Sequence, residues 1–578
     1  MSHRLLRVLD RRPFFVLVLL LSITLLTGGL ATQLKFEFSP QALLAGNDDL
    51  IRDLEEMKRT FSIQDSVLLV VIEATGDRDV IAPEILNWQA ETVKIFEIRD
   101  GVTEVRSIAT MEIPGRTLSF SPELEIRPLI PDFPADEDDA DRVRRTIERV
   151  PSLTGTMLSE DLKLGMMLVY LSTDFEAVEQ MAPVVHELGN HLKESPPPAG
   201  YRVSLSGLPY IRVDAVAALE KDQARLLPLS GALYLVALVL VFRRVAGSLL
   251  PLFAVGMSLV WLMGIMVAVG SSFNLVSNIL PILLMVIGMS NCVHLLDAYA
   301  EVLHETQGDR REAARQTTQY MSRCCLLTLL TTGIGFICLS AARSDVLREF
   351  AWQAAVGIAC LYVCIIGTFG ALLRFFRPSR RSVSGAPLGY LTATLGRWVT
   401  THPRAIMLAS GLVVLGAVLL GSTVRVNSSV IETYDDQHPT QVTMRAVERH
   451  LTGLLPIEVH LTSTDEERLL TNEVAQTIRQ FEAQALTHPE VLYARSHIDV
   501  LQDLTGLTES EWEAETRDRT IDRGLSYARR IGGLSGLSDF LTADHREARV
   551  LLKVRDAGTL RLREVIADLH RDLRQRFP

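Results

Sequence analysis

The sequence predicts a polytopic α-helical membrane protein that carries α+β domains outside the membrane. Long uncharged stretches alternate with segments of ordinary soluble composition, so the hydrophobic fraction of 48% averages over two kinds of chain. A bilayer core needs about 20 apolar residues for each helix. The 578 residues contain seven such stretches, and a long diverged repeat relates the two halves of the chain.

The seven candidate spans leave two large polar segments, residues 32–225 and 424–578. The second span is short and the fourth contains polar groups, so the ends of these two are the least sharply defined. We expect the polar segments to fold as the α+β domains. The spans are expected at residues 13–31, 226–242, 248–270, 274–299, 324–341, 350–375 and 404–423.

The first span follows a basic N-terminus, a pattern that an uncleaved membrane anchor shares with a cleaved signal peptide. Its apolar run is long for a signal peptide, and no clean small-x-small cleavage site follows it. We therefore expect an uncleaved anchor, with a signal peptide as the alternative. The basic residues in front of this span are Arg4, Arg7, Arg11 and Arg12.

Arginines gather in the loops that lie on the same side of the membrane as the N-terminus. Because short cytoplasmic loops carry an excess of Lys and Arg, this bias predicts a cytoplasmic N-terminus (residues 1–12) and a cytoplasmic linker at residues 376–403. Both large polar segments then lie outside the cytoplasm. The loop arginines are Arg243, Arg244, Arg310, Arg311, Arg315, Arg323, Arg374, Arg377, Arg380, Arg381, Arg397 and Arg404.

Composition argues against several other classes of protein. The net charge of −11 does not fit a nucleic-acid-binding protein, which shows a basic face. All six cysteines lie in or beside hydrophobic stretches and lack zinc-site spacing, so neither a disulfide framework nor a metal centre is expected. The sequence contains no Walker A loop, nucleophile elbow or H-E-x-x-H pattern. We therefore expect no enzyme activity and no cofactor.

The repeat begins at two apolar anchors. In the first copy, an apolar span leads into Gln33-Leu-Lys-Phe-Glu-Phe-Ser. In the second, His402-Pro-Arg and an apolar span lead into Val424-Arg-Val-Asn-Ser-Ser. Each copy then continues into a β-rich stretch, Asp65-Ser-Val-Leu-Leu-Val-Val-Ile and Leu455-Pro-Ile-Glu-Val-His-Leu-Thr. The two polar segments are therefore interpreted as versions of one domain.

The later part of each polar segment repeats as well. Leu158-Ser-Glu-Asp-Leu-Lys-Leu-Gly parallels Leu541-Thr-Ala-Asp-His-Arg-Glu-Ala, and both predict a turn, a strand and then a helix. This order indicates split βαβ modules of the ferredoxin-like type. The first copy goes on through Tyr201-Arg-Val-Ser-Leu-Ser, whereas the second stops at Arg576-Phe-Pro. We expect a C-terminally truncated chain with an incomplete second domain; a true short protein is the alternative.

Two membrane spans carry a recognisable motif: span four reads Asn278-Ile-Leu-Pro-Ile-Leu-Leu-Met-Val-Ile-Gly-Met-Ser-Asn-Cys-Val-His-Leu-Leu, and span five contains Leu330-Thr-Thr-Gly-Ile-Gly-Phe. With these motifs the chain resembles the resistance-nodulation-division (RND) superfamily, in its MMPL-like branch of hydrophobe/amphiphile exporters, whose five-helix core is shared with sterol-sensing domains. Val346-Leu-Arg-Glu-Phe before span six agrees. The resemblance covers essentially the whole chain, and its motif glycines are Gly288, Gly333 and Gly335.

The resemblance implies a bacterial inner-membrane transporter with an RND-type pseudo-repeat and two porter-like domains in the periplasm. Such proteins export lipid-like hydrophobic or amphiphilic molecules, driven by proton influx. The implied partners are membrane lipids and the transported molecule, with no nucleic acid; a homo-oligomer or a periplasmic partner protein is left open. A non-transporting membrane sensor or scaffold with a sterol-sensing-like core is the alternative function.

This sequence departs from the family pattern in span four. After the span-four glycine the family places one or two aspartates that carry the proton, whereas this chain has Ser290 and Asn291, which do not titrate in a useful range. The nearest ionisable residues, His294 and Asp297, share a helix face with Ser290. Histidine titrates near physiological pH, so we hypothesise that His294 takes over part of the proton transfer. Simple hydrogen bonding between helices is the alternative.

Other polar residues of spans four and five have two interpretations each. Thr328, Thr331 and Thr332 lie on one side of span five, where their hydroxyls either form a polar relay facing span four or bond between packed helices. Asp297 lies near the cytoplasmic end of span four, where a solvated carboxylate is the simpler interpretation. Asn274 and Asn278, at the outer end of that span, are expected to hold an irregular helix start, with a contact to the substrate as the alternative.

Overall fold

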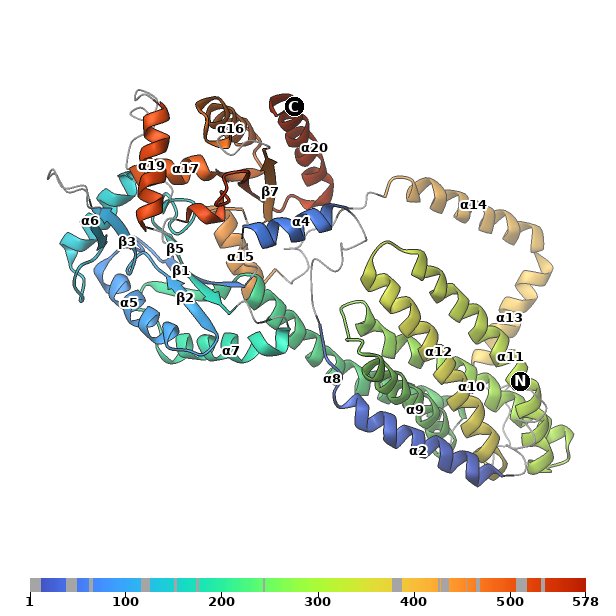
Figure 1. Ribbon diagram of the computed structural model, residues 1–578. Helices are drawn as coiled ribbons and strands as arrows, with labels where there is room; N and C mark the ends of the chain where they lie inside the picture. Colours follow the sequence, from blue (N-terminus) through green and yellow to red (C-terminus); the bar gives the residue numbers. More distant parts are fainter. Residues whose placement is uncertain are drawn as a thin grey trace. The chain divides into compact units, whose positions relative to one another are not determined.

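The chain divides into two units, whose helices and strands are labelled in Figure 1. Met1–Asp48 and Asp214–Val424 form the membrane unit, and Asp49–Val213 and Arg425–Pro578 form the α+β unit. The computed structural model describes residues 12–37, 49–61, 66–115, 125–149, 153–172, 175, 177–242, 245–376, 387–424, 427, 436–453, 455–463, 468–505, 517–531 and 536–577.

Seven helices of the described chain are long and apolar enough to cross a membrane, which confirms the predicted polytopic helical architecture. Helices α2 (Pro13–Ala31), α9 (Val245–Val269) and α14 (Pro403–Gly421) lie close to the expected first, third and seventh spans. Both α2 and α14 begin with proline, whose fixed φ suits the first helical turn and whose missing N–H costs nothing there. The two anchors of the repeat therefore start in the same way.

The other four helices have limits that differ from those predicted. Helix α8 (Leu208–Phe242) begins well before residue 226, α11 (Arg310–Cys338) before residue 324, and α12 (Asp345–Leu372) before residue 350. Helix α10 (Leu280–Glu305) follows a 3₁₀ turn at Ser277–Ile279 and extends beyond residue 299. Hydropathy marks only the part of a helix that matches hydrocarbon, whereas backbone hydrogen bonding continues through polar turns. These helices therefore extend beyond the predicted spans, whose limits within the membrane stay predictions.

The compact units and the predicted domains, whose limits stay predictions, are divided at different residues. The boundary between the units falls at Val213 and Asp214, inside α8, rather than after residue 225. Helix α13 (Pro387–Thr401) occupies much of the segment 376–403 that was expected to be a linker. Several arginines on which the predicted orientation rests lie outside the described residues: Arg4, Arg7, Arg11, Arg243, Arg244, Arg377, Arg380 and Arg381.

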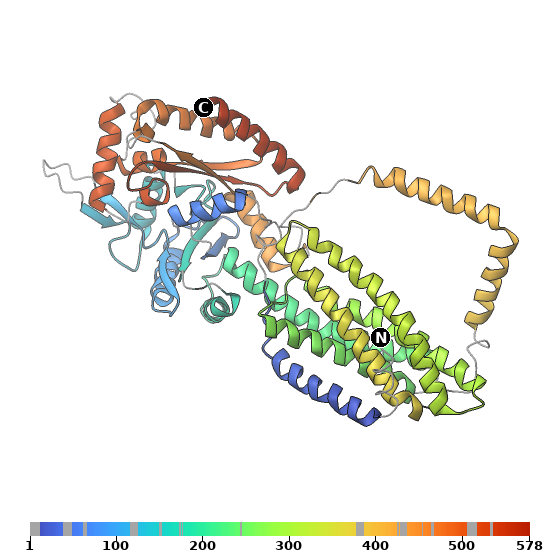
Figure 2. The same ribbon diagram turned by 45° about the vertical axis from the view of Figure 1, so that its right-hand side comes forward.

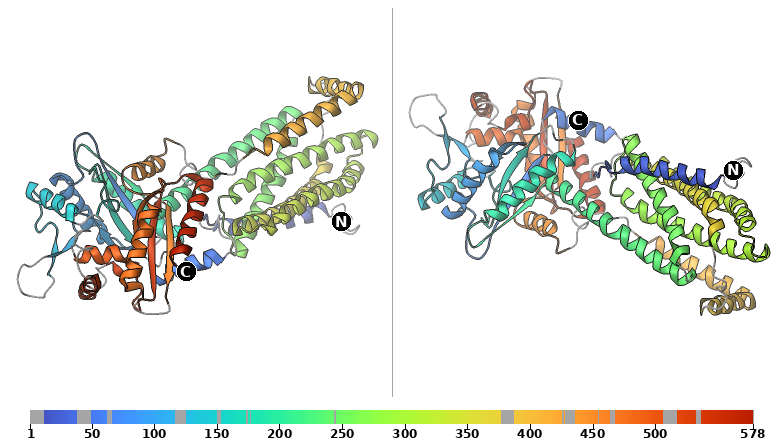
Figure 3. Two further views of the ribbon diagram at one scale, coloured as in Figure 1. Left: turned by 90° about the horizontal axis from the view of Figure 1, so that it is seen from above. Right: turned by 90° about the horizontal axis from the view of Figure 1, so that it is seen from below.

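The membrane unit is held together by close contacts at small residues. Helix α10 packs against α9, α11 and α12, and their shared core includes Leu284, Leu295 and Leu361. Helix α2 lies along α9 and α12, as the view from below in Figure 3 shows. At Gly264 of α9 an added Cβ would lie only 2.5 Å from the backbone oxygen of Thr27 on α2. Small side chains allow such approach in a membrane, where no hydrophobic force drives helices together.

The first lobe of the α+β unit (residues 49–213) confirms the predicted ferredoxin-like module. Its four-stranded sheet has the order β2-β5-β1-β6, and every neighbouring pair is antiparallel. This is the strand order of two interleaved βαβ units. The module is built from β1 (Val67–Ala74), α5 (Pro83–Glu97), β2 (Val102–Arg106), β5 (Leu164–Leu171), α7 (Val178–Glu194) and β6 (Tyr201–Ser206). The remaining elements are α4 (Asp49–Thr60), β3 (Glu112–Gly115), β4 (Glu125–Pro128) and α6 (Glu137–Arg149).

The second lobe (residues 425–578) repeats most of this module. Its sheet has the order β7-β9-β8, and α16 and α20 lie side by side over it (Figure 2). Within the described residues, β7 pairs with β9 alone, whereas its counterpart β1 also pairs with β6. The module consists of β7 (Leu455–Thr462), α16 (Asn472–Ala485), β8 (Val491–Arg495), β9 (Glu547–Val554) and α20 (Gly558–Arg576), with α15 (Pro439–His450), α17 (His497–Thr505) and α19 (Arg517–Ile531) around it.

The turn before the third strand of each module is the most closely repeated feature. In the first lobe, Asp161 accepts from the Ser159 hydroxyl (2.6 Å) and from the Lys163 N–H (3.0 Å). In the second, Asp544 accepts from the Thr542 hydroxyl (2.6 Å) and the Arg546 N–H (3.2 Å). One residue in each turn, Leu162 and His545, has a positive φ near 55°, which is unusual for a residue other than glycine. The repeat seen in the sequence is therefore a repeat in structure.

Helix α15 belongs to the second copy in sequence but packs on the sheet of the first lobe. Val447 is buried in a cluster with Val71, Leu164 and Met166 of strands β1 and β5. The Thr443 hydroxyl also donates to Ser204 Oγ on β6 (3.0 Å). The two lobes of the α+β unit are therefore joined by an element that crosses from one copy of the repeat to the other.

One fully buried histidine makes the second lobe sensitive to acid. His497 Nε2 lies 3.0 Å from the Leu469 carbonyl oxygen, and burial lowers the pKa of the ring to about 4. An unfolded histidine titrates near pH 6.5. As the pH falls from 6.5 to 4, the unfolded chain gains a proton that the folded chain does not. The free energy of unfolding of this lobe therefore decreases by up to about 3 kcal/mol.

We predict that His497→Leu removes much of this acid sensitivity. Pulse proteolysis in urea at pH 7.5 and pH 4.5, followed by detection of fragments from residues 468–577, compares the variant with the wild type. Burial raises the pKa of Glu482, which gives the opposite pH dependence but is common to both proteins and cancels in the comparison. Equal losses of stability in the two proteins would contradict the assignment.

Candidate functional site

Helix α10 has a packed face and an open face. Pro281 lies in its first turn, and Leu284, Gly288 and Asn291 follow on the packed side. Asn291 is only 8% exposed, and its amide donates to the Ile287 carbonyl of the same helix (2.9 Å). Asn291 points into the bundle, whereas its neighbour Ser290 is exposed, so Asn291 belongs to the packing of α10.

Ser290, His294 and Asp297 lie together on the open face of α10, as their spacing predicts. All three side chains are exposed in the membrane unit. Within the described part of the chain, none of the three makes a side-chain hydrogen bond or ion pair. An ionisable group on a membrane-spanning helix is costly unless protein or water covers it. This face therefore marks a surface of the unit at which polar side chains gather.

The threonines of α11 satisfy their hydroxyls within their own helix. Thr328 donates to the Cys324 carbonyl (2.9 Å), and Thr331 and Thr332 both donate to the Thr328 carbonyl (2.8 and 2.9 Å). Thr328 and Thr331 are exposed, and Thr332 is half-buried. Bonding back to the preceding turn is the usual behaviour of threonine in an apolar helix. A polar relay from α11 to α10 stays a prediction. It would require the threonine hydroxyls to rotate away from the carbonyls of their own helix.

The three motif glycines differ in what surrounds them. A Cβ added at Gly288 would lie 2.7 Å from both Leu361 Cδ1 and Val255 Cγ2, so this glycine lets α10 approach α12 and α9. At Gly333 a Cβ would meet Ile358 at an ordinary 3.8 Å, and at Gly335 no atom lies within 4 Å. Gly288 is therefore a packing requirement, whereas Gly335 lies on open helix surface.

A second polar group, which the sequence analysis missed as a unit, lies at one end of the membrane unit. Glu349 on α12 accepts from the Ser271 hydroxyl and from the Asn274 amide (3.2 Å). Gln353, one turn further along α12, is fully buried; it donates to Ser271 Oγ (2.8 Å) and accepts from the Ser277 hydroxyl. Each buried polar atom thus gains a partner, which removes most of the cost of its burial. The network ties α12 to the segment before α10.

Asn274 and Asn278 lie in this segment, as the sequence predicted for an irregular helix start. Asn274 Oδ1 accepts from the backbone N–H groups of Val276 and Ser277 (3.1 and 2.9 Å), in the manner of a helix cap. Glu349 and Gln353 are spaced i, i+4 on α12, and both polar residues stand at the edge of an apolar run. That spacing was the signal for the network, but their partners are far away in sequence.

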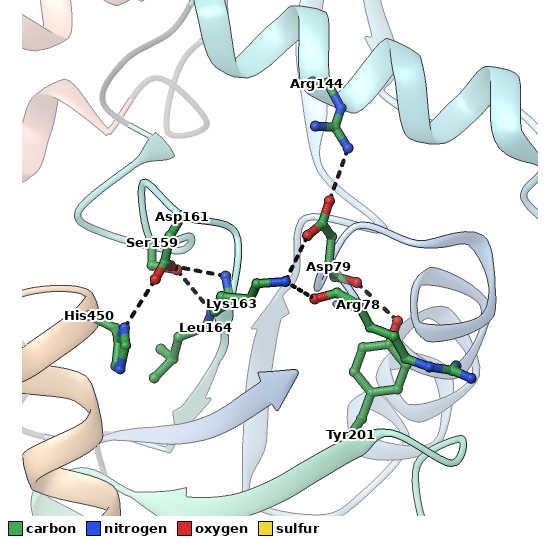
Figure 4. A network of polar contacts seen from close by, with 9 residues as sticks. All are labelled: Arg78, Asp79, Arg144, Ser159, Asp161, Lys163, Leu164, Tyr201 and His450. Carbon is green, nitrogen blue, oxygen red and sulfur yellow. Dashed lines mark hydrogen bonds and ion pairs between the residues drawn. The ribbon is translucent and has the colours of Figure 1, made fainter. Parts of the chain in front are cut away.

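The α+β unit contains a polar network that joins its two lobes (Figure 4). His450 Nδ1 on α15 lies 3.2 Å from Asp161 Oδ2 in the first-lobe turn. Burial opposes ionisation of Asp161, but hydrogen bonds from Ser159, the Lys163 backbone and His450 together lower the pKa of this carboxyl. The network continues from the Lys163 ammonium to the Arg78 carbonyl (2.6 Å) and to Asp79 (3.4 Å).

Charged side chains also cover one face of the second-lobe sheet. Arg549 on β9 pairs through two nitrogens with Glu458 on β7 (2.6 and 2.7 Å). Burial, together with the charges of Arg495 and Arg549, lowers the pKa of Lys553 to about 8. Near neutral pH this lysine is therefore charged but much closer to its titration point than a solvated lysine. The arrangement gives the α+β unit a charged layer outside its apolar core.

Comparison with known proteins agrees with this architecture. The model of the MMPL family matches residues 42–420, more than half of the chain. The chain belongs to the MMPL family. The match runs from the α+β unit through the complete set of helices α8 to α14, so the family assignment includes the polar face of α10 and the network at Glu349.

Curated relatives are similar at low identity. The chain is 21% identical over 371 residues to a putative membrane protein of Methanocaldococcus jannaschii, an alignment that covers 63% of this chain and 91% of the relative. It is 24% identical over 391 residues to the probable transport protein MmpL2 of Mycobacterium tuberculosis, covering 63% of this chain and 39% of MmpL2. It is also 24% identical over 306 residues to the probable transport protein MmpL10 of Mycobacterium leprae, covering 50% of this chain and 29% of MmpL10. The chain therefore spans well under half of each mycobacterial relative.

The resemblance to the RND/MMPL group that the sequence indicated is thereby confirmed, as is a multi-pass membrane protein. The assignment of Ser290, Asn291, His294, Asp297 and the span-five threonines to a proton pathway stays a prediction. In this MMPL-family chain, Ser290 and Asn291 follow Gly288 closely on α10, and His294 lies one turn beyond Ser290.

We predict that Gly288→Ala destabilises the membrane unit by about 1–3 kcal/mol, because its methyl group meets Leu361 and Val255. The matched control Gly335→Ala adds a methyl group in open space and should be neutral or slightly stabilising. A thiol-reactive fluorophore follows thermal unfolding in detergent as the buried cysteines Cys292, Cys325, Cys360 and Cys364 become reactive. Equal unfolding temperatures for the two variants would show that the glycine contact is not tight.

Proposed function

We propose that the chain is the translocating part of a transporter that exports lipid-like hydrophobic or amphiphilic molecules across the bacterial inner membrane, coupled to the inward movement of protons. The observation that carries the proposal is the gathering of Ser290 and His294 on the open face of a membrane-spanning helix in an MMPL-family chain. The names of the mycobacterial relatives, probable transport proteins, support transport. Membership of the family supports a non-enzymatic role.

The physical argument for His294 rests on cost. A charged side chain at the centre of a membrane helix costs about 3 kcal/mol on insertion scales. A neutral imidazole avoids most of that cost, and histidine is the side chain that most often carries protons in proteins. Ser290 one turn away offers a hydroxyl that can pass or accept a hydrogen bond. His294 is thus the group on this face best suited to respond to a proton gradient.

Orientation is the second part of the proposal. The arginine bias supports a cytoplasmic N-terminus, so that the α+β unit is periplasmic and takes up the transported molecule from the outer side. Lipid-like molecules fit this location because the membrane itself delivers them. The partners that we propose are accordingly membrane lipids and the exported molecule.

A membrane sensor or scaffold is the second candidate function, and a specific observation favours it. Ser290 and Asn291 replace the titratable residues of the family pattern, and Asn291 is used in packing within α10. A chain that had lost proton coupling would retain the five-helix core and the α+β unit. This candidate therefore depends on whether His294 transfers protons.

We predict that His294→Ala lowers proton-driven movement of a fluorescent NBD-labelled phospholipid in proteoliposomes by on the order of 100-fold, the contribution of a well-placed proton-transfer group. His294→Asp should restore part of the activity with a pH optimum shifted towards acid, because Asp titrates near pH 4. His304→Ala, which changes an exposed histidine at the end of the same helix, is the matched control. Unchanged activity in His294→Ala would exclude this role, and a wild type inactive at every pH would leave the sensor function.

For orientation, we predict that a single cysteine at Lys193 reacts with a membrane-impermeant maleimide in intact spheroplasts, in a cysteine-free background. A cysteine at Gln307, in the turn between α10 and α11, should react only after the membrane is permeabilised. Both positions are exposed, so a difference in labelling reports the side of the membrane and not burial. The reverse pattern would place the α+β unit in the cytoplasm.

A further inference from the structure

The short segment at residues 271–279, between α9 and α10, is bonded to three other parts of the membrane unit. It contains the network partners Ser271, Asn274 and Ser277 and ends in the 3₁₀ turn Ser277–Ile279. Because α10 begins at the next residue, Leu280, any displacement of this segment is passed directly to the start of α10. A helix transmits such a displacement along its axis as a nearly rigid body.

The first connection is to the chain that leaves α2. The Phe273 N–H donates to the Lys35 carbonyl (2.7 Å), and the Glu37 N–H donates to the Phe273 carbonyl (2.9 Å). The Phe36 and Phe273 rings pack edge to face with centroids 5.5 Å apart, and Phe273 is 1% exposed. This pair of backbone bonds is a short piece of β-ladder, so the chain after α2 and the segment before α10 move together.

The second connection is to α8. Gln223 Nε2 lies 2.6 Å from the Asn278 carbonyl oxygen and 2.5 Å from Asn278 Oδ1, so one amide nitrogen donates to both the backbone and the side chain of Asn278. Among the described residues, Gln223 Oε1 is buried and has no hydrogen-bond partner. Leaving a buried amide oxygen unpaired is costly, and a leucine of similar size would avoid the cost. The presence of glutamine here is therefore better explained by the hydrogen bonds from its Nε2 to Asn278 than by packing.

The third connection is the network of Glu349 and Gln353 described above, which fixes the segment to α12. The chain passes between the membrane unit and the α+β unit after Asp48 and before Asp214. In the part of the chain that the structure describes, the residues after α2 and the first half of α8 both bond to residues 271–279. The chain after α2 and helix α8 are thus both bonded to the residues that precede α10.

We infer that Gln223 and Asn278 are positioning residues that couple α8 to α10, so that movement of α8 shifts the face of α10 carrying Ser290 and His294, and the reverse. The inference rests on the proposed function, because coupling matters only if α10 carries the proton step. Neither residue touches a proton or a transported molecule. Their contact sets the height of α10 relative to α8.

The test uses the full-length protein with four variants. Gln223→Leu removes the amide but keeps the size of the side chain, and Asn278→Ala removes one of the two acceptors. The double variant Gln223→Asn with Asn278→Gln exchanges the longer and the shorter amide across the same contact and should restore the bond. Asp222→Asn changes the neighbouring exposed residue of α8 and is the matched control.

In proteoliposomes, enclosed pyranine reports proton influx and NBD-labelled phosphatidylethanolamine reports lipid movement. We expect Gln223→Leu to lower the lipid moved per proton about tenfold, the effect of losing one buried hydrogen bond from the coupled state, while proton influx stays unchanged. The double variant should restore the wild-type ratio of lipid moved per proton. Asn278→Ala should give a ratio between those of Gln223→Leu and the wild type, and Asp222→Asn should give the wild-type ratio. A ratio in Gln223→Leu equal to that of the wild type, or one that the double exchange does not restore, overturns the inference.

A second readout separates this inference from the proposed function. Amide hydrogen exchange over residues 271–279 should be about tenfold faster in Gln223→Leu than in the wild type and return to the wild-type rate in the double exchange. If the wild type moves neither protons nor lipid, the proposed function fails, and the exchange data alone judge the contact. Exchange rates that are the same in all variants then overturn the positioning role.

Discussion

Close packing of α10 against α9 and α12 is the constraint on which the membrane unit depends. At Gly288 and Gly357 the helices approach so closely that an added Cβ would lie within 2.7 Å of neighbouring leucine or valine carbons. In hydrocarbon, such contacts replace the hydrophobic force as the source of helix association. They also fix the rotation of α10 about its axis. That rotation puts Asn291 into the bundle and leaves Ser290, His294 and Asp297 on the open face.

The α+β unit obeys a different constraint, the pairing of strands in water. Each lobe needs a sheet with one face covered by helices, and each lobe uses the same Ser/Thr-x-Asp turn to start its third strand. Helix α15 then joins the lobes, since its apolar residues are buried on the sheet of the first copy. The repeat has therefore produced one body from two modules, with His450 and Asp161 in contact across them.

Within the membrane unit, residues 271–279 join α10 to the chain after α2, to α8 and to α12. The backbone ladder at Phe273, the amide of Gln223 and the carboxylate of Glu349 converge on nine residues that precede α10. In an MMPL-family chain, this is where a displacement of α8 or of the chain after α2 reaches the helix that carries His294. Polar bonds suit this purpose because they have direction and join specific pairs of atoms.

The sequence by itself determined the seven spans, the repeat, the ferredoxin-like modules and the shared face of Ser290, His294 and Asp297. All of these follow from local periodicity, since hydropathy and the 3.6-residue helix repeat act within one element. Tertiary structure alone decided where α8, α11 and α12 begin, which side of α10 is packed, and that α15 crosses to the other lobe. It also decided that Glu349, Gln353 and Gln223 bond to Ser271, Asn274 and Asn278. Such pairs join residues that are 55 or more positions apart in the chain, so no local pattern specifies them.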